Sequence, residues 1–327
     1  MITNVHVQKP KVLCIAGPTA IGKTQLAMRL KDRAGVKLIS VDSALVYRGM
    51  DIGSAKPSAA ELRHYPHELI NIRDHWDTYT AADFVRDARA KIVEAVSDKL
   101  TPVLVGGTMM YFKALIDGLS PLPPADQAFR TALEVRAAKS GWPQIHRELA
   151  AKDPLTAAKI HPNHSQRIER ALEIIHLTGK PVGELRDRKE GLSNDYSFIV
   201  SALVPVDRLS LHARINERFV RMLEAGFVDE VAQLRKLPHH RDDLPSMRAV
   251  GYRQCLGYLN NETTKDEFVD KGQAATRQLC KRQLTWLRNW KNMNRHPVSF
   301  SSSNPYGTPV ELDQITACLL KFCEKSS

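Results

Sequence analysis

The chain has 327 residues, 43% hydrophobic and 25% charged, a composition that excludes an intrinsically disordered protein. Lys and Arg outnumber Asp and Glu by 47 to 36, and the resulting formal net charge of +11 favours an anionic partner. The sequence has no signal-peptide pattern, no apolar run near the ~20 residues that span a membrane and no C-x-x-C pair, so we expect a reduced, cytoplasmic protein without membrane contact.

Short apolar strands alternate with helices over residues 1–119. The pattern predicts strands at 12–16, 37–41, 68–72 and 101–105, and helices at 22–34 and 81–99. Such alternation is typical of an α/β fold in which helices flank a parallel sheet. In these folds ligands gather at the carboxyl ends of the strands, so the loops after the strands are the first places to look for a site.

The loop after the first predicted strand carries a phosphate-binding motif. Residues 17–24 read G-P-T-A-I-G-K-T and fit the pattern G-x-x-x-x-G-K-[ST] between a strand and a helix. A fortuitous glycine-rich turn is the alternative, but the strand and helix context favours a P-loop, whose amides and helix N-terminus bind a di- or triphosphate. Lys23 then reaches the terminal phosphates, and the Thr24 hydroxyl is a candidate Mg²⁺ ligand. The residues concerned are Gly17, Pro18, Thr19, Ala20, Ile21, Gly22, Lys23 and Thr24.

Two further strand ends carry polar side chains that can face the same cleft. Asp42 follows the strand at 37–41 and is a candidate general base, a residue that contacts magnesium through a bound water, or a simple turn cap. Thr108 follows Gly106 and Gly107, where the backbone can approach a ligand closely. No carboxylate ends the strand at 101–105, which counts against ATP hydrolysis.

Beyond residue 119 the pattern changes. We divide the chain into a first core segment at 1–119, a mostly helical insertion at 120–195, a second core segment at 196–296 and a C-terminal tail at 297–327. The second core segment begins with a predicted strand and continues with helices at 208–225, 227–237 and 265–292. Within the insertion, Arg167 and Arg170 can contact phosphate or can pair with Glu173 on a helix surface.

The stretch at 272–296 holds six basic residues and no carboxylate. Arg277, Lys281 and Arg288 fall near one helical face, which suits contact with a phosphate backbone, although a solvated basic helix remains the alternative. Trp286 and Trp290 are one helical turn apart, and we expect both to pack in the core.

Taken together, several stretches identify a family. They are the P-loop, D-S-A-L-V-Y-R-G-M-D-I-G-S-A-K-P at 42–57, G-G-T-M-M-Y at 106–111 and K-R-Q-L-T-W-L-R at 281–288, with further matches at 166–173 and 248–253. The chain resembles the bacterial tRNA dimethylallyltransferases from about residue 11 to residue 295, and the stretches at 42–57 and 281–288 are the distinctive ones. Ile21 and Ser54 depart from the usual family residues without removing a phosphate or metal ligand.

The resemblance implies transfer of a dimethylallyl group from dimethylallyl diphosphate to the exocyclic amine of the adenosine 3′ of the anticodon in tRNA. It implies Mg²⁺ as cofactor, an insertion that grips the anticodon stem, no membrane partner and a monomer. Asp42 and Thr108 are then the catalytic candidates, and Arg218 joins the P-loop in binding diphosphate. The implied tRNA contacts are Asp42, Ser43, Ala44, Leu45, Thr108, Arg130, Gln166, Arg167, Ile168, Glu169, Arg170, Arg248, Gly251, Tyr252, Arg253, Lys281, Arg282, Gln283 and Arg288.

Three other functions use a similar loop. A small-molecule kinase would not need the basic stretch at 272–296 or the insertion. An adenylate prenyltransferase shares the chemistry but would not need a long RNA-gripping insertion. A nucleic-acid-dependent ATPase would carry a second carboxylate motif.

Overall fold

A computed structural model describes residues 9–185, 191–300 and 309–323, and its centre is one six-stranded sheet. The strand order is β3-β2-β4-β1-β5-β6, and each pairing among the described residues is parallel. The strands are β1 (Lys11–Ala16), β2 (Val36–Val41), β3 (His67–Glu68), β4 (Thr101–Gly106), β5 (Ser197–Pro205) and β6 (Asn294–Val298). The predicted α/β class with a parallel sheet is confirmed.

The third strand is much shorter than predicted. Residues 68–72 were expected to form it, but only His67–Glu68 pairs with β2. Leu69 and Asn71 have φ of 65° and 57°, values in the left-handed region that a strand cannot contain. The chain therefore turns away from the sheet immediately after Glu68.

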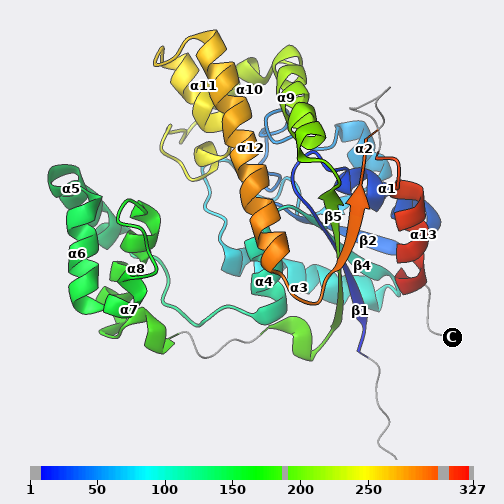
Figure 1. The fold of residues 1–327 in the computed structure, drawn as a ribbon, viewed down its shortest axis with the longest axis horizontal. Helices are drawn as coiled ribbons and strands as arrows, with labels where there is room; N and C mark the ends of the chain where they lie inside the picture. The colour runs from blue at the N-terminus through cyan, green and yellow to red at the C-terminus, as the bar shows by residue number, and fades with distance from the viewer. Residues whose placement is uncertain (1–8, 186–190, 301–308, 324–327) are drawn as a thin grey trace, which may run out of the picture. The chain divides into compact units, whose positions relative to one another are not determined.

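The chain divides into two compact units, Asp117–Leu192 and the remainder, Met1–Ile116 with Ser193–Ser327. The predicted insertion at 120–195 overlaps the first of these. The remainder holds the sheet and most of the helices (Figure 1). These helices are α1 (Lys23–Arg33), α2 (Ala59–His64), α3 (Ala81–Ser97), α4 (Met109–Asp117), α9 (Arg208–Glu224), α10 (Phe227–Leu234), α11 (Tyr252–Leu259), α12 (Lys265–Asn289) and α13 (Leu312–Cys323).

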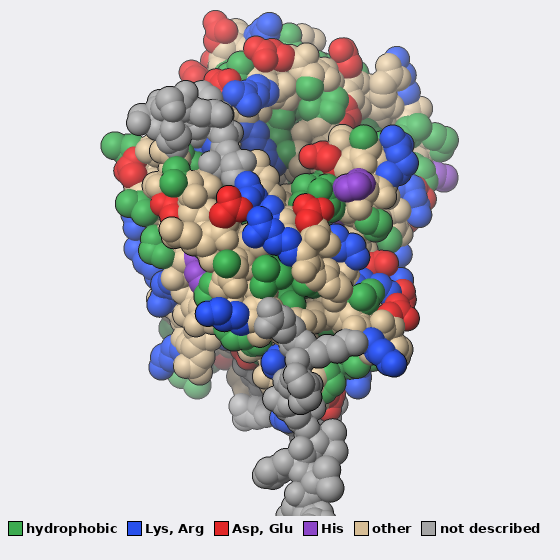
Figure 2. All heavy atoms as spheres, turned by 90° about the vertical axis from the view of Figure 1, so that its right-hand side faces the viewer, with side chains coloured by type: hydrophobic (Ala, Val, Ile, Leu, Met, Phe, Trp, Pro, Cys, Tyr) green, Lys and Arg blue, Asp and Glu red, His purple; other side chains and the backbone are tan. Residues whose placement is uncertain are grey.

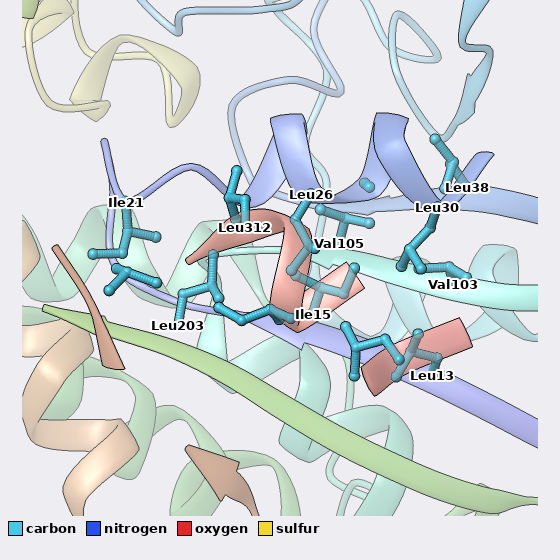
Figure 3. Packing of buried hydrophobic residues seen from close by; sticks show 14 of the residues in the cluster. Leu13, Ile15, Ile21, Leu26, Leu30, Leu38, Val103, Val105, Leu203 and Leu312 are labelled. Atoms are coloured by element: carbon cyan, nitrogen blue, oxygen red, sulfur yellow. The ribbon is translucent and has the colours of Figure 1, made fainter. Parts of the chain in front are cut away.

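Apolar side chains from β1, β4 and α1 interlock on one face of the sheet. Leu13 and Ile15 of β1 lie beside Val103 and Val105 of β4 because alternate residues of a strand point to the same face. Figure 3 shows Leu26 and Leu30 of α1 packed over these residues. This packing holds the helix that follows the phosphate-binding loop firmly on the sheet.

The described parts of residues 297–327, which were predicted only as a tail, contribute to the same core. Residues 294–298 form the edge strand β6 beside β5, and α13 packs against α1 and β1 (Figure 1). Leu312, Ile315 and Leu319 of α13 lie in the core cluster, and Figure 3 shows Leu312 close to Leu26. The spacing of these three residues is that of one buried helical stripe.

The other unit is a small helical bundle with its own core. Its helices are α5 (Gln127–Ser140), α6 (Trp142–Lys152), α7 (Pro154–Ala157) and α8 (Ser165–Thr178). Leu133, Ile145, Leu149 and Ile168 are among the buried residues that join α5, α6 and α8. This second core allows the unit to hold its own shape.

The surface is mixed in charge where Figure 2 shows it. That face lies on the right of Figure 1, and basic and acidic side chains are interspersed across it. Among the described residues, no helix is both long and apolar enough to cross a membrane.

Candidate active site

The phosphate-binding loop joins β1 to α1 in a conformation that needs small residues. Ala20 and Gly22 have φ of 63° and 102°, and Gly22 is the N-cap of α1. A side chain at position 17 would place its Cβ 3.1 Å from the Leu203 carbonyl oxygen, so Gly17 is required for close packing. The alternation of left-handed and ordinary residues before a helix N-terminus forms an anion-binding concavity.

Two cations lie at this concavity, and burial lowers the pKa of both. The Lys23 Nζ donates a hydrogen bond to the Pro18 carbonyl oxygen at 2.7 Å. Burial lowers the pKa of Lys23 to about 8 and that of Arg218, on α9, to about 10, while the nearby carboxylate of Asp42 opposes both changes. A bound anion would favour the charged forms of Lys23 and Arg218 and so raise the pKa of both, which suits the site to a diphosphate.

Asp42 and Thr108 form the adjoining wall. Asp42 Oδ1 accepts hydrogen bonds from the backbone amides of Ala44 (2.8 Å) and Leu45 (3.3 Å), as expected of a turn cap. Its Oδ2 has no hydrogen-bond partner within the described parts of the chain and remains available to a ligand. The Thr108 hydroxyl accepts a hydrogen bond from the Ser43 amide at 3.2 Å and so ties the end of β4 to the turn after β2.

A cavity of about 480 Å³ unites these groups. The predicted residues that line it are Thr19, Ala20, Lys23, Thr24, Asp42, Ser43, Ala44, Leu45, Thr108, Arg218, Arg248, Gly251, Tyr252, Arg282 and Gln283. Ile21 and Gly22 line a neighbouring cavity of about 320 Å³, where the Arg214 Nε donates to the Ala20 carbonyl oxygen at 3.1 Å. The structure thus brings the three strand-end loops together at one edge of the sheet.

The family-specific segment 42–57 is fixed by a residue that the sequence analysis did not identify. The Glu230 carboxylate accepts hydrogen bonds from the amides of Asp51 (2.9 Å), Ile52 (2.5 Å) and Gly53 (3.1 Å) and from the Tyr252 hydroxyl (2.6 Å). No local pattern marks Glu230, because the three backbone amides that donate to it are more than 170 residues away in the chain. Tyr252 is fully buried, so its side chain supports the wall rather than reaching outward to RNA.

Lys56 fixes the same segment from within. Its Nζ donates to the carbonyl oxygen of Tyr47 (2.7 Å), to Asp51 Oδ1 (2.6 Å) and to Asn71 Oδ1 (2.6 Å). Its side chain is only 2% exposed. Segment 42–57 is therefore a built wall of the cavity.

A pair of histidines holds the loop that leads to Arg248. His75 is buried, and its Nε2 lies 3.1 Å from Nδ1 of His240, whose Nε2 is 3.0 Å from Asp242 Oδ1. The Ser246 hydroxyl donates to the carbonyl oxygen of His75. Burial and the neighbouring His240 lower the pKa of His75.

Oxygen ligands suited to a hard divalent cation lie in the cavity. They are the hydroxyls of Thr24 and Ser40 and the carboxylate of Asp42. The Ser40 hydroxyl was not predicted; it is buried and has no hydrogen-bond partner among the described residues. In those residues no cluster of three His, Cys, Asp or Glu could hold a metal, so a cation here would depend on these few oxygens and on a bound phosphate. That is the usual pattern for Mg²⁺.

Helix α12 forms another wall and carries the basic stretch. Lys281, Arg282 and Arg288 are exposed, as a phosphate-contacting face requires. Trp286, expected in the core, is instead 43% exposed and lines the cavity. Trp290 is half-buried and lies edge-on against Phe112, with 6.1 Å between the ring centroids. Since α12 is packed on one side only, the two tryptophans one turn apart reach different surroundings.

Gln283 and Arg253, both predicted to contact RNA, differ from each other in exposure. Gln283, on the inner side of α12, is only 8% exposed and bonds to the backbone of the cavity wall. By contrast, Arg253 lies exposed on α11.

The predicted RNA-binding residues of the helical unit are only partly accessible. Gln166 and Arg167 are exposed on α8, and Glu169 is half-buried, but Ile168 is fully buried in the unit's core and its side chain is not available to RNA. Arg130 and Arg170 both bond to the fully buried carboxylate of Glu173.

The buried carboxylate of Glu173 is fully paired. Arg130 donates to both oxygens of Glu173, at 2.7 and 2.9 Å, and the Asp126 amide donates to Oε1 at 2.7 Å. Burial alone would raise the pKa of Glu173, but Arg130 and Arg170 hold that pKa at about 2. Arg130 and Arg170 thus pair with a buried carboxylate while their own side chains stay partly exposed, so the surface pairing considered for Arg170 involves a buried partner.

Comparisons with known proteins agree with one another. The family model for IPP transferase matches residues 45–290. A tRNA dimethylallyltransferase of Thiobacillus denitrificans (strain ATCC 25259 / T1) is 54% identical over 282 residues, 86% of this chain and 90% of that protein.

Solved structures show the same likeness over nearly the whole chain. The full-length tRNA isopentenylpyrophosphate transferase of Bacillus halodurans is 35% identical with a TM-score of 0.67, covering 96% of this chain and 97% of that one. A eukaryotic dimethylallyltransferase acting on tRNA is 25% identical with a TM-score of 0.70, covering 88% and 74%. With its P-loop, its parallel sheet and these relatives, the chain belongs to the IPP transferase family of tRNA-modifying prenyltransferases.

Proposed function

We propose that the protein transfers a dimethylallyl group from dimethylallyl diphosphate to the exocyclic amine of the adenosine 3′ of the anticodon in tRNA. The observation that carries this proposal is the single cavity in which the phosphate-binding loop, Asp42 and Thr108 meet the basic helix α12. The membership of the IPP transferase family supports the same reaction. We further propose that the protein acts in the cytoplasm, where its tRNA substrate is found, and as a monomer.

The side chains of the cavity divide the reaction between them. The bond between the dimethylallyl carbon and the diphosphate oxygen breaks, and the adenine nitrogen forms a new bond to that carbon. Lys23, Arg218 and the loop amides stabilise the negative charge that grows on the departing diphosphate. Asp42 accepts the proton that the amine loses, through its unpaired Oδ2. Thr108 orients the turn that carries Asp42.

The target adenine must leave its stack to reach this cavity. The exposed face of Trp286 at the cavity provides a surface on which a nucleobase can stack. Lys281, Arg282 and Arg288 on the same helix then neutralise backbone phosphates.

Mg²⁺ is the cofactor we propose. The hydroxyls of Thr24 and Ser40 would hold it together with the diphosphate oxygens, and when bound it would supply positive charge to the leaving group. Asp42 keeps its Oδ2 for the proton of the amine in the same scheme.

The test is an assay of prenyl transfer with three acceptors. The protein is mixed with dimethylallyl diphosphate, Mg²⁺ and either an unmodified tRNA, AMP or ATP, and the products are separated by mass. We expect transfer to tRNA alone. Transfer to AMP would identify an adenylate prenyltransferase, and ATP turnover without prenyl transfer would identify a phosphotransferase or ATPase; either result would overturn the proposal.

A further inference from the structure

Gln283 stands on the RNA-facing helix α12, yet its side chain points to the sheet. It lies among exposed Lys281, Arg282 and Arg288, but it is itself only 8% exposed. Its side-chain oxygen accepts a hydrogen bond from the Thr19 amide at 2.9 Å, and its side-chain nitrogen donates to the Gly107 carbonyl oxygen at 2.9 Å. One amide thus bridges the phosphate-binding loop and the turn before Thr108.

This bridge needs the oxygen and the nitrogen of the Gln283 side-chain amide, and it needs a glycine at position 107. A Cβ at position 107 would lie 2.5 Å from Nε2 of Gln283, so only glycine leaves room for this contact. Neither a carboxylate nor an apolar side chain of the same length can both accept from Thr19 and donate to Gly107. Because the amide is buried, loss of one partner would leave a backbone group unsatisfied.

The helix that carries Gln283 is able to transmit a displacement. It is a continuous 25-residue helix held in place by buried Phe268, Cys280 and Leu287. Arg282, which precedes Gln283 in the chain, and Trp286, which follows it, both line the cavity. A polyanion that docks on the exposed side therefore acts on a rigid element that is bonded directly to the phosphate-binding loop.

We infer that Gln283 is a positioning residue that couples RNA binding on α12 to diphosphate binding in the loop. The inference rests on the proposed function and adds to it a thermodynamic link between the two substrates. Such a link is reciprocal, so each substrate should strengthen the binding of the other by the same factor, typically about 5- to 150-fold.

The coupling can be measured with the full-length chain and a slowly reacting analogue of the prenyl donor. The Kd of dimethylallyl S-thiolodiphosphate, a slowly reacting analogue, is measured with and without saturating anticodon stem-loop RNA. In the unsubstituted protein we expect the RNA to lower this Kd at least about fivefold. In Gln283→Met the ratio should approach one, and the KM for dimethylallyl diphosphate should rise more than kcat falls.

Two further variants separate coupling from folding. Gln283→Glu retains the acceptor for Thr19 but not the donor for Gly107, and we expect an intermediate ratio. Gln233→Met makes the same chemical change at an exposed site on α10 and should behave like the unsubstituted protein.

The outcomes are distinct. An unchanged ratio in Gln283→Met would overturn the inference, as would equal losses for both substrates accompanied by a lower Tm, which would mark a purely structural role. Absence of prenyl transfer by the unsubstituted protein would instead refute the proposed function.

Discussion

The charge state of Lys23 should control diphosphate binding between pH 7 and pH 9. Burial lowers its pKa from 10.5 to about 8. That change corresponds to roughly 3 kcal/mol at about 1.4 kcal/mol for each pKa unit, and a bound diphosphate should recover much of it by favouring the ammonium form. The free protein is then about 90% protonated at Lys23 at pH 7 and only about 10% at pH 9.

Two measurable effects result from this difference. The Kd of dimethylallyl S-thiolodiphosphate should rise about tenfold from pH 7 to pH 9, and binding at pH 9 should take up about 0.9 proton. Calorimetry in two buffers of different ionisation enthalpy, without metal, gives both quantities. The ligand's own phosphate titrates near pH ~6, outside this range. Arg218, with a pKa of about 10, remains largely charged at pH 9.

Lys23→Met provides the control. Its binding should be weaker at pH 7 but should neither decline further nor take up a proton near pH 9. The reasoning would be refuted by negligible proton uptake in the unsubstituted protein at pH 9, or by equal uptake in Lys23→Met.

Three other predictions concern the walls of the cavity. Asp42→Asn keeps an oxygen for the turn amides but removes the base. The rate constant of prenyl transfer in single-turnover assays should therefore fall about 10²- to 10⁴-fold with little change in tRNA affinity. An equal loss of affinity would exclude Asp42 as the base. Glu230→Ala leaves three amides and the Tyr252 hydroxyl without their acceptor, so the free energy of unfolding in urea should decrease by at least about 2 kcal/mol. The control Glu224→Ala, at an exposed position, should lower it by less than about 0.5 kcal/mol. Burial lowers the pKa of His75 in the folded state, so the unfolded chain binds the proton first as pH falls below about 6.5. The free energy of unfolding should therefore decrease as pH falls through this range, and it should decrease less in His75→Gln. Equal changes of unfolding free energy with pH in the two proteins would contradict this prediction.

Short-range patterns account for what could be predicted. The apolar run before Gly17, the motif through Thr24 and the helix after it lie within about one supersecondary unit, and local spacing alone identifies such a unit. The same holds for Asp42 and Thr108, because a residue at the end of a parallel strand lies at the carboxyl edge of the sheet whatever the rest of the chain does.

Long-range contacts account for what could not. Glu230 meets its amide partners across almost 180 residues, and Gln283 meets Thr19 across 264. Trp286 has the same apolar character as Trp290, and only the packing of α12 decides which one is exposed. The hidden pairing of Arg130 and Arg170 with Glu173 likewise depends on how the helices of their unit meet.

The position of α13 has a consequence for how the protein is made. Arg29 of α1 forms an ion pair with Asp313 of α13, 284 residues later, and Leu312 and Leu319 cover apolar residues of α1 and its sheet. At about 5 to 20 residues per second, synthesis leaves that surface uncovered for roughly 14 to 57 seconds. During this interval the nascent chain carries a phosphate-binding loop on a helix whose apolar side is open. Chaperones that bind exposed apolar surface therefore have ample time to act, and early termination of translation would yield chains prone to aggregate.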